Sequence, residues 1–124
     1  TKPVQFWAWL MRQVRATDPD MAGVAALPLP GVIVTAAGGD GVDFTSRYFA
    51  PAKGVPEDPV TGAAHCVLAP FWAARLGQER IAGFQASWRG GSIDCTLAGD
   101  RVLLAGRARL YMRGEITLDD GVAI

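Results

Sequence analysis

The stretch Glu57–His65, with the sequence EDPVTGAAH, contains the side chains best suited to chemistry. Asp58 stands directly before a run of uncharged residues that is predicted to form a helix. Amide groups at a helix start lack partners within the helix, and the small residues 62–64 let a ligand approach them. With the helix dipole, these amides favour a bound carboxylate or phosphate. The pattern therefore predicts an anion site with an acid, Asp58, placed to transfer a proton beside it.

The same residues also fit a purely structural interpretation. Asp58 is a good N-cap, Pro59 is typical of the first helical position, and Thr61 adds a second capping side chain. Helix caps are far commoner than catalytic acids. The spacing alone therefore leaves both interpretations open.

His65 is the sole histidine, and it follows Thr61 by one helical turn. It is either a general base or ligand contact, or a histidine buried in the core, which is the commoner case. A Ser-His-Asp triad would need one of three serines beside it, and no nucleophile-elbow sequence is present. One histidine excludes a multi-histidine metal site within one chain, so no metal is predicted.

Arg47 interrupts an apolar strand and has two interpretations. It binds a substrate carboxylate, or it forms a structural ion pair with Asp43 or Glu57, and the structural pairing is favoured. The two cysteines, Cys66 and Cys95, form no CxxC pair or disulfide framework and are predicted to be small core residues.

Composition narrows the class of protein. Twelve Lys and Arg residues balance twelve Asp and Glu residues, so the net charge is zero. This argues against a nucleic-acid partner and against a polybasic membrane patch. No apolar stretch reaches the roughly 18 residues of a spanning helix, and cysteine usage favours the cytoplasm. The length of 124 residues, half of them apolar, predicts one domain over residues 1–124.

The central element is a predicted helix over Pro59–Ala74, whose apolar residues cover every side. Such a helix is typical of a domain centre. Arg75 and Gly77 end it, and Pro70 is expected to kink it.

The other elements are mostly short strands. Val4–Val14 is left as strand or helix, and a short helix is expected from Asp18, as N-cap, to Ala26. The predicted strands are Gly31–Ala37, Val42–Phe49, Ile81–Trp88, Ser92–Leu97, Arg101–Ala105, Arg107–Arg113 and Glu115–Leu118. The predicted fold class is α+β, with an antiparallel, barrel-like sheet wrapped around one buried central helix and no parallel βαβ unit.

The run Arg47–Pro51 (RYFAP), Gly54 and Glu57–Cys66 (EDPVTGAAHC) resembles the signature of the PhzF-like family, the phenazine-biosynthesis group of the diaminopimelate-epimerase fold. The similarity covers essentially the whole chain, and the central motif is long and specific. It continues through Pro70-Phe71-Trp72, Arg75-Leu76-Gly77, Gln85, Ser87, Arg89-Gly90-Gly91 and Ala105-Gly106.

The resemblance implies a cofactor-independent isomerase or epimerase that moves a proton at carbon near the carboxylate of a small metabolite. It implies that Asp58 is the functional acid. Arg47 and Glu57, considered from their own positions in the sequence, are possible further site residues. The substrate-binding residues that the resemblance implies are Thr61, Gly62, Ala63, Ala64 and His65.

Members of this family have two similar halves with the active site between them, and this chain resembles only the C-terminal half. The family's catalytic glutamate belongs to the other half. The resemblance therefore implies a partner, which is a separate N-terminal half-domain or a second copy in a homodimer.

One position departs from the family pattern. Ala63 replaces a serine whose hydroxyl would contact substrate, a loss of about 0.5–1.5 kcal/mol for one hydrogen bond. This difference favours the alternative of a non-catalytic domain that binds small anions or another protein and has kept the fold.

Overall fold

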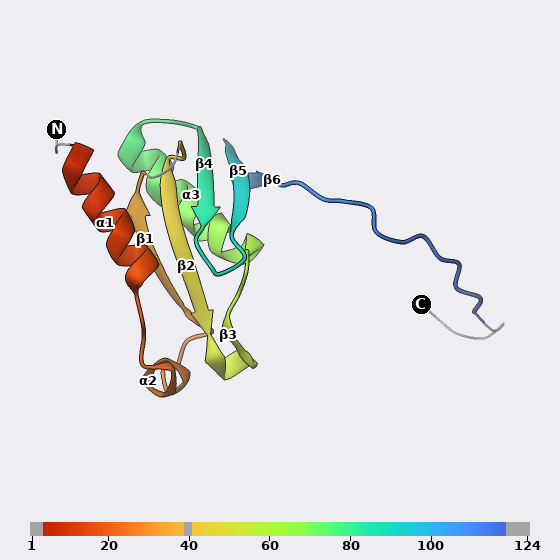
Figure 1. Cartoon of the computed structure of the whole chain (residues 1–124). Helices are drawn as coiled ribbons and strands as arrows, with labels where there is room; N and C mark the ends of the chain where they lie inside the picture. The colour runs from red at the N-terminus through yellow and green to blue at the C-terminus, as the bar shows by residue number, and fades with distance from the viewer. Residues whose placement is uncertain (1–3, 39–40, 119–124) are drawn as a thin grey trace.

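The structure is a computed structural model that describes residues 4–38 and 41–118, and residues 4–9 by their backbone alone (Figure 1). Its helices are α1 (Val4–Ala16), α2 (Met21–Ala25) and α3 (Gly62–Leu76), with one 3-10 turn, η1 (Pro51–Lys53). Its strands are β1 (Val32–Ala37), β2 (Phe44–Ala50), β3 (Val55–Glu57), β4 (Arg80–Gln85), β5 (Gly91–Ala98) and β6 (Arg101–Ala105).

The strands form one mixed sheet in the order β1-β2-β4-β5-β6, and β3 pairs with the far end of β2. All these pairs are antiparallel except β2 and β4, which run parallel from Phe44 opposite Gly83 to Ser46 opposite Gln85. The α+β class is therefore confirmed, whereas the prediction of an antiparallel sheet without a βαβ unit is wrong. Because α3 lies between β2 and β4 in the chain, these elements form a parallel crossover.

The helix α3 packs on one face of the sheet, and α1 lies on the other. The indole of Trp72, in α3, donates to Thr35 of β1. Arg47 of β2 donates to carbonyl groups at the end of α1. Side chains alternate between the faces of a strand, and Arg47 stands opposite Val34, the neighbour of Thr35. The two helices therefore cover opposite faces.

The core lies between α3 and the sheet. Phe44 is fully buried, and its ring stacks on that of Trp72 with centroids 6.2 Å apart. Cys95 is buried as predicted, and burial raises the pKa of its thiol to about 11. The buried residues of α3 are Ala64, His65, Leu68, Ala69, Trp72 and Ala73.

The opposite side of α3 is exposed, so the prediction of a helix buried on all sides is wrong for the described chain. Val67 is 64% exposed, Phe71 is 40% exposed, and Cys66, expected in the core, is also exposed. The sheet covers α3 from one side only. The predicted closure of the sheet around the helix is accordingly not seen.

Several element boundaries differ from the sequence prediction. Residues 4–14, left open, belong to a helix, and α3 begins at Gly62 rather than at Pro59. α2 begins after Asp20 rather than Asp18, because the Asp20 carboxylate accepts the amide of Ala22 at 3.1 Å. β3 lies in a stretch for which no strand or helix is predicted. The end of α3 is as predicted, with Gly77 in the left-handed conformation.

Residues 106–118 extend away from β6 without regular secondary structure, as the blue segment in Figure 1 shows. The strands predicted over Arg107–Arg113 and Glu115–Leu118 are therefore wrong. A strand needs a neighbour to pair its backbone groups, and no described strand pairs with this segment.

Candidate active site

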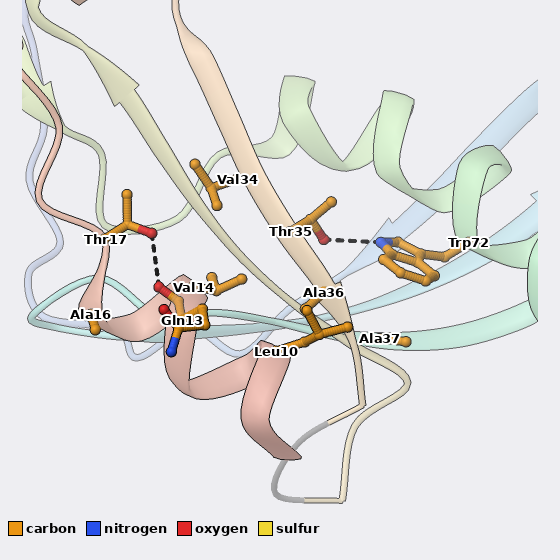
Figure 2. A pocket seen from close by; sticks show the side chains of 10 residues that line it. All are labelled: Leu10, Gln13, Val14, Ala16, Thr17, Val34, Thr35, Ala36, Ala37 and Trp72. Carbon is orange, nitrogen blue, oxygen red and sulfur yellow. Dashed lines mark hydrogen bonds between the residues drawn. The ribbon is translucent and has the colours of Figure 1, made fainter. Parts of the chain in front are cut away.

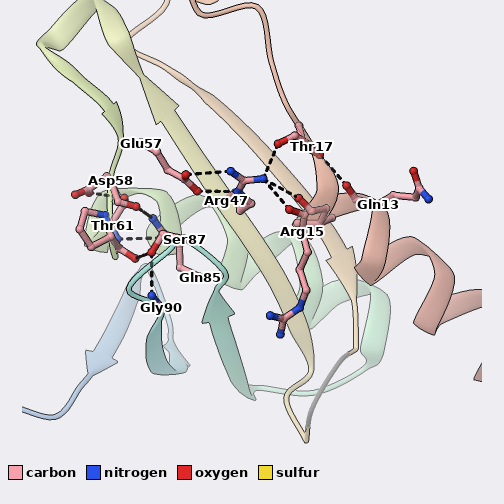
Figure 3. A network of polar contacts seen from close by, with 12 residues as sticks. Gln13, Arg15, Thr17, Arg47, Glu57, Asp58, Thr61, Gln85, Ser87 and Gly90 are labelled. Carbon is pink, nitrogen blue, oxygen red and sulfur yellow. Dashed lines mark hydrogen bonds and ion pairs between the residues drawn. The ribbon is translucent and has the colours of Figure 1, made fainter.

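Asp58 lies in the turn between β3 and α3, and this turn is held at both ends (Figure 3). The amide of Asp58 donates to the carbonyl of Tyr48 in β2 at 3.1 Å. The hydroxyl of Thr61 donates to Asp58 Oδ2 at 2.5 Å. The crossover from β2 to α3 thus places the carboxylate beside the first turn of α3.

Gln85, at the end of β4, connects both sides of this turn. Its Oε1 accepts the amide of Thr61 at 2.9 Å, and its Nε2 donates to the carbonyl of Asp58 at 2.7 Å. The same Nε2 lies 3.0 Å from Thr61 Oγ1. The hydroxyl of Ser87 also holds this turn, since it donates to the carbonyl of Pro59 at 2.7 Å.

Gln85 is not among the residues predicted for the site, although the pattern of β4 contains a signal for it. Ile81, Gly83 and Gln85 alternate along β4, and Ile81 and Gln85 are both buried. A polar side chain on the buried face of a strand needs partners, and such a residue is informative because it is uncommon.

The predicted caps of the helix are absent. Thr61 occupies the N-cap position of α3, but its side chain makes no capping hydrogen bond. Its hydroxyl instead donates to Asp58. Asp58 is not the N-cap, because Thr61 occupies that position. Among residues 4–38 and 41–118, no side chain accepts from the first amides of α3, and Gly62 and Ala63 are exposed. This is the arrangement that an anion site requires.

A cavity of about 780 Å³ reaches this helix start at Gly62 and is also lined by Gly90 and Gly91. Gly91 must be glycine, because an added Cβ would lie 2.6 Å from the Cβ of Val60. Asp58 does not line this cavity, and its carboxylate contacts Thr61, which directly precedes Gly62.

A second cavity, of about 390 Å³, lies between α1 and β1 and reaches Trp72 (Figure 2). Its lining contains hydroxyl and amide groups but no titratable side chain. It therefore offers no group for acid-base chemistry. The cavity that reaches α3 is the better candidate for a substrate.

His65 is fully buried, and its ring lies 5.7 Å from that of Phe44. Its Nδ1 is 2.7 Å from the carbonyl of Thr61, so Nδ1 carries the proton and donates. Its Nε2 is buried without a partner in the described chain. Burial lowers the pKa of His65, against a smaller opposing effect of the Thr61 hydrogen bond. These contacts fit the interpretation of a core histidine.

The buried His65 predicts a loss of stability in acid. The unfolded state binds the proton more tightly, so the free energy of unfolding falls as pH drops through about 6.5 toward the lower folded value. The slope contributed by one proton is at most about 1.4 kcal/mol per pH unit. Urea unfolding between pH 5 and 8 measures it, and His65→Gln is expected to flatten this part of the curve. An unchanged curve in the variant would contradict the assignment.

Arg47 and Glu57 form an ion pair apart from the Asp58 turn (Figure 3). Arg47 Nε and Nη2 lie 2.7 and 3.0 Å from the two carboxylate oxygens. The hydrogen bond to Glu57 raises the pKa of Arg47, and its Nη1 donates to carbonyls at the end of α1. The favoured structural pairing is confirmed with Glu57, whereas Asp43 accepts the amide of Ala82.

Replacing Arg47 by methionine is expected to lower the free energy of unfolding by about 3 kcal/mol, because it leaves a largely buried carboxylate unpaired. Arg101→Met, at an exposed position of β6, is the matched control, with an expected change below about 0.5 kcal/mol. Urea unfolding at pH 7 compares the two variants. Equal values would show that the ion pair contributes nothing.

None of the helices within residues 4–38 and 41–118 has the length and apolar composition of a membrane-spanning segment. Nor, in this part of the chain, do three or more His, Cys, Asp or Glu side chains gather as metal ligands.

Comparison with known proteins identifies the family. A family model described as phenazine biosynthesis-like protein (PhzC-PhzF) matches residues 10–114. The chain belongs to this family. The resemblance expected from the EDPVTGAAHC motif is thereby confirmed.

Similar members of the phenazine biosynthesis-like family are bacterial and mammalian. An uncharacterized isomerase of Pseudomonas aeruginosa is 55% identical over 105 residues, which are 85% of this chain and 40% of that protein. A phenazine biosynthesis-like domain-containing protein of Rattus norvegicus is 45% identical, over 73% of this chain and 36% of its own length. The crystal structure of a PhzF-family protein of Enterococcus faecalis has a TM-score of 0.77 and 44% identity, over 86% of this chain and 41% of that one. The chain thus spans about two-fifths of these relatives.

Proposed function

We propose that the chain forms half of a cofactor-independent isomerase or epimerase of the PhzF type. In this proposal, the amides at the start of α3 bind the carboxylate of a small metabolite. Asp58 takes a proton from, or returns one to, a carbon next to that carboxylate. The names of the bacterial relatives support an isomerase in general.

One observation carries the proposal: the Asp58 carboxylate stands beside a helix start that no side chain of the described part of the chain caps. A bound carboxylate at those amides would bring its neighbouring carbon toward the acid. Acid-base transfer by a placed carboxyl group is typically worth about 10²–10⁴-fold in rate. Of the other residues expected at the site, Thr61 contacts Asp58 directly. The His65 ring bonds to the carbonyl of Thr61, and the Arg47 guanidinium bonds to Glu57, so neither contacts Asp58.

The second acid-base group must come from outside this chain's Asp58 turn. We infer that it comes from a second half-domain or from a second copy of the chain. In the second case, the Asp58 residues of the two copies would face each other across a shared cleft. The uncovered side of α3 supports a partner, since exposed apolar patches commonly mark interfaces. Sedimentation equilibrium distinguishes the cases, because a stable dimer supports two copies and a monomer supports a separate half.

The test of function is solvent-hydrogen exchange. The chain is incubated in deuterated water with small amino and hydroxy acids, and deuterium at the carbon beside the carboxylate is measured by mass spectrometry. Incorporation that depends on Asp58 supports the isomerase. If the chain is a dimer, bound carboxylate without incorporation, detected by calorimetry, would overturn it.

The alternative is a non-catalytic domain that binds small anions or another protein. Ala63 favours it, because the methyl group cannot supply the hydroxyl that the family's serine offers. Ala63→Ser discriminates the two functions, since it should raise exchange in an enzyme and leave a binding domain without turnover.

A further inference from the structure

The side-chain amide of Gln85 makes a set of contacts that admits only one arrangement of protons (Figure 3). It is fully buried, so water does not substitute for any of its partners. Its oxygen faces the amide of Thr61, which can only donate. Its nitrogen faces the carbonyl of Asp58, which can only accept. These two backbone groups fix the orientation of the amide.

The fixed amide determines the direction of the next hydrogen bond. Nε2 has one proton for the carbonyl of Asp58 and a second for Thr61 Oγ1, 3.0 Å away. Because the nitrogen is a donor only, Thr61 Oγ1 must accept from it. The one proton of the Thr61 hydroxyl is then left for Asp58 Oδ2 at 2.5 Å. The order runs from Gln85 through Thr61 to Asp58.

We propose that Gln85 is a positioning residue, which directs the Thr61 hydroxyl onto Asp58 Oδ2 and leaves Oδ1 free to exchange a proton with substrate. Among the described residues, Asp58 Oδ1 accepts no hydrogen bond, which agrees with this division between the two oxygens. The role in proton exchange rests on the proposed function. The order of the hydrogen bonds does not.

Gln85 also keeps the anion site open. Thr61 occupies the N-cap position, where a threonine side chain normally accepts an amide of the first helical turn. Its hydroxyl is instead held between Gln85 and Asp58. Without Gln85, the hydroxyl can turn to cap α3 and occupy the amides that are proposed to bind a carboxylate. One side chain therefore serves both the acid and the anion site.

The experiment is NMR spectroscopy of the full labelled chain without any ligand. In the unmodified protein, the side-chain amide protons of Gln85 should exchange with solvent at least about tenfold more slowly than those of the exposed Gln78, as hydrogen-bonded protons do. In Thr61→Val, one of the two Gln85 protons should lose its partner and shift, while the proton on the Asp58 carbonyl stays. Thr61→Ser keeps the hydroxyl and should leave both unchanged.

A second variant tests the effect on Asp58. Gln85→Glu still accepts the Thr61 amide but cannot donate to Oγ1, so the resonance of the Asp58 carboxyl carbon should shift. Gln78→Glu is the matched control and should leave that resonance in place. The proposal would be overturned if the Gln85 side-chain protons exchanged as fast as those of Gln78, or if Thr61→Val left their chemical shifts unchanged. Both outcomes can be measured even if Gln85→Glu fails to fold.

The experiments can contradict the positioning role of Gln85 and the proposed function of Asp58 independently of each other. If the NMR results hold while Asp58→Asn leaves isotope exchange unchanged, the hydrogen-bond order stands and the function of Asp58 is wrong. If isotope exchange needs Asp58 while Gln85 shows no protected protons, the function stands and the positioning role is wrong.

Discussion

Asp58→Asn is expected to lower solvent-hydrogen exchange by about 10²–10⁴-fold, the range for removing a placed acid or base. Asparagine has nearly the same shape, and its oxygen can still accept the Thr61 hydroxyl, so the turn should persist. It cannot carry a proton between substrate and solvent. The measurement is deuterium incorporation per unit time at saturating carboxylic acid.

The control for this variant is Asp100→Asn, in the exposed turn between β5 and β6, which should retain full exchange. The NMR spectrum of each variant checks that the fold is intact. Full activity in Asp58→Asn, with the fold retained, would remove Asp58 from the reaction and leave the anion-binding alternative.

Phe44→Ala is expected to lower the free energy of unfolding by about 3–5 kcal/mol, the usual cost of removing a buried phenylalanine ring. Phe44 is fully buried between Trp72 and Gly83, where any side chain at position 83 would collide with its ring. The cavity left by alanine would lie under α3, beside His65 and Trp72. Urea unfolding followed by tryptophan fluorescence measures the loss.

Val67→Ala is the control, since its side chain is on the exposed side of α3 and should change the free energy of unfolding by less than about 0.5 kcal/mol. A similar loss in both variants would show that the exposed side of α3 is covered in solution. A small loss in Phe44→Ala would show that the core does not depend on this ring.

Much of the site could be predicted from local sequence. Asp58 before a long apolar run, the small residues 62–64 and the ending glycine at Gly77 define one helix and its surroundings. These features depend on residues that are close in sequence, so hydrophobic periodicity and the residue preferences at helix ends can predict them. The same reasoning explains why β1, β2 and β5 lie close to their predicted ranges.

The remaining features depend on contacts between distant residues. No local pattern shows that Phe44–Ser46 pairs in parallel with Gly83–Gln85, or that Gln85 holds Thr61. Nor does periodicity distinguish a helix buried in its own domain from one whose second side awaits a partner. The apolar pattern of α3 was interpreted as full burial, and the exposure of Val67 shows what that pattern leaves open.

Because β2 pairs with β4 across α3, the site can form only when the sheet forms. The Asp58 turn is anchored on Tyr48 and on Gln85, which stand on different strands with all of α3 between them. The bond to Tyr48 joins residues that both precede α3, whereas the chain must close a loop across all of α3, at a cost in entropy, before Gln85 can hold the turn. No short peptide containing EDPVTGAAH would therefore hold its carboxylate in this place. The turn should melt together with the sheet, in one cooperative transition, rather than fray on its own.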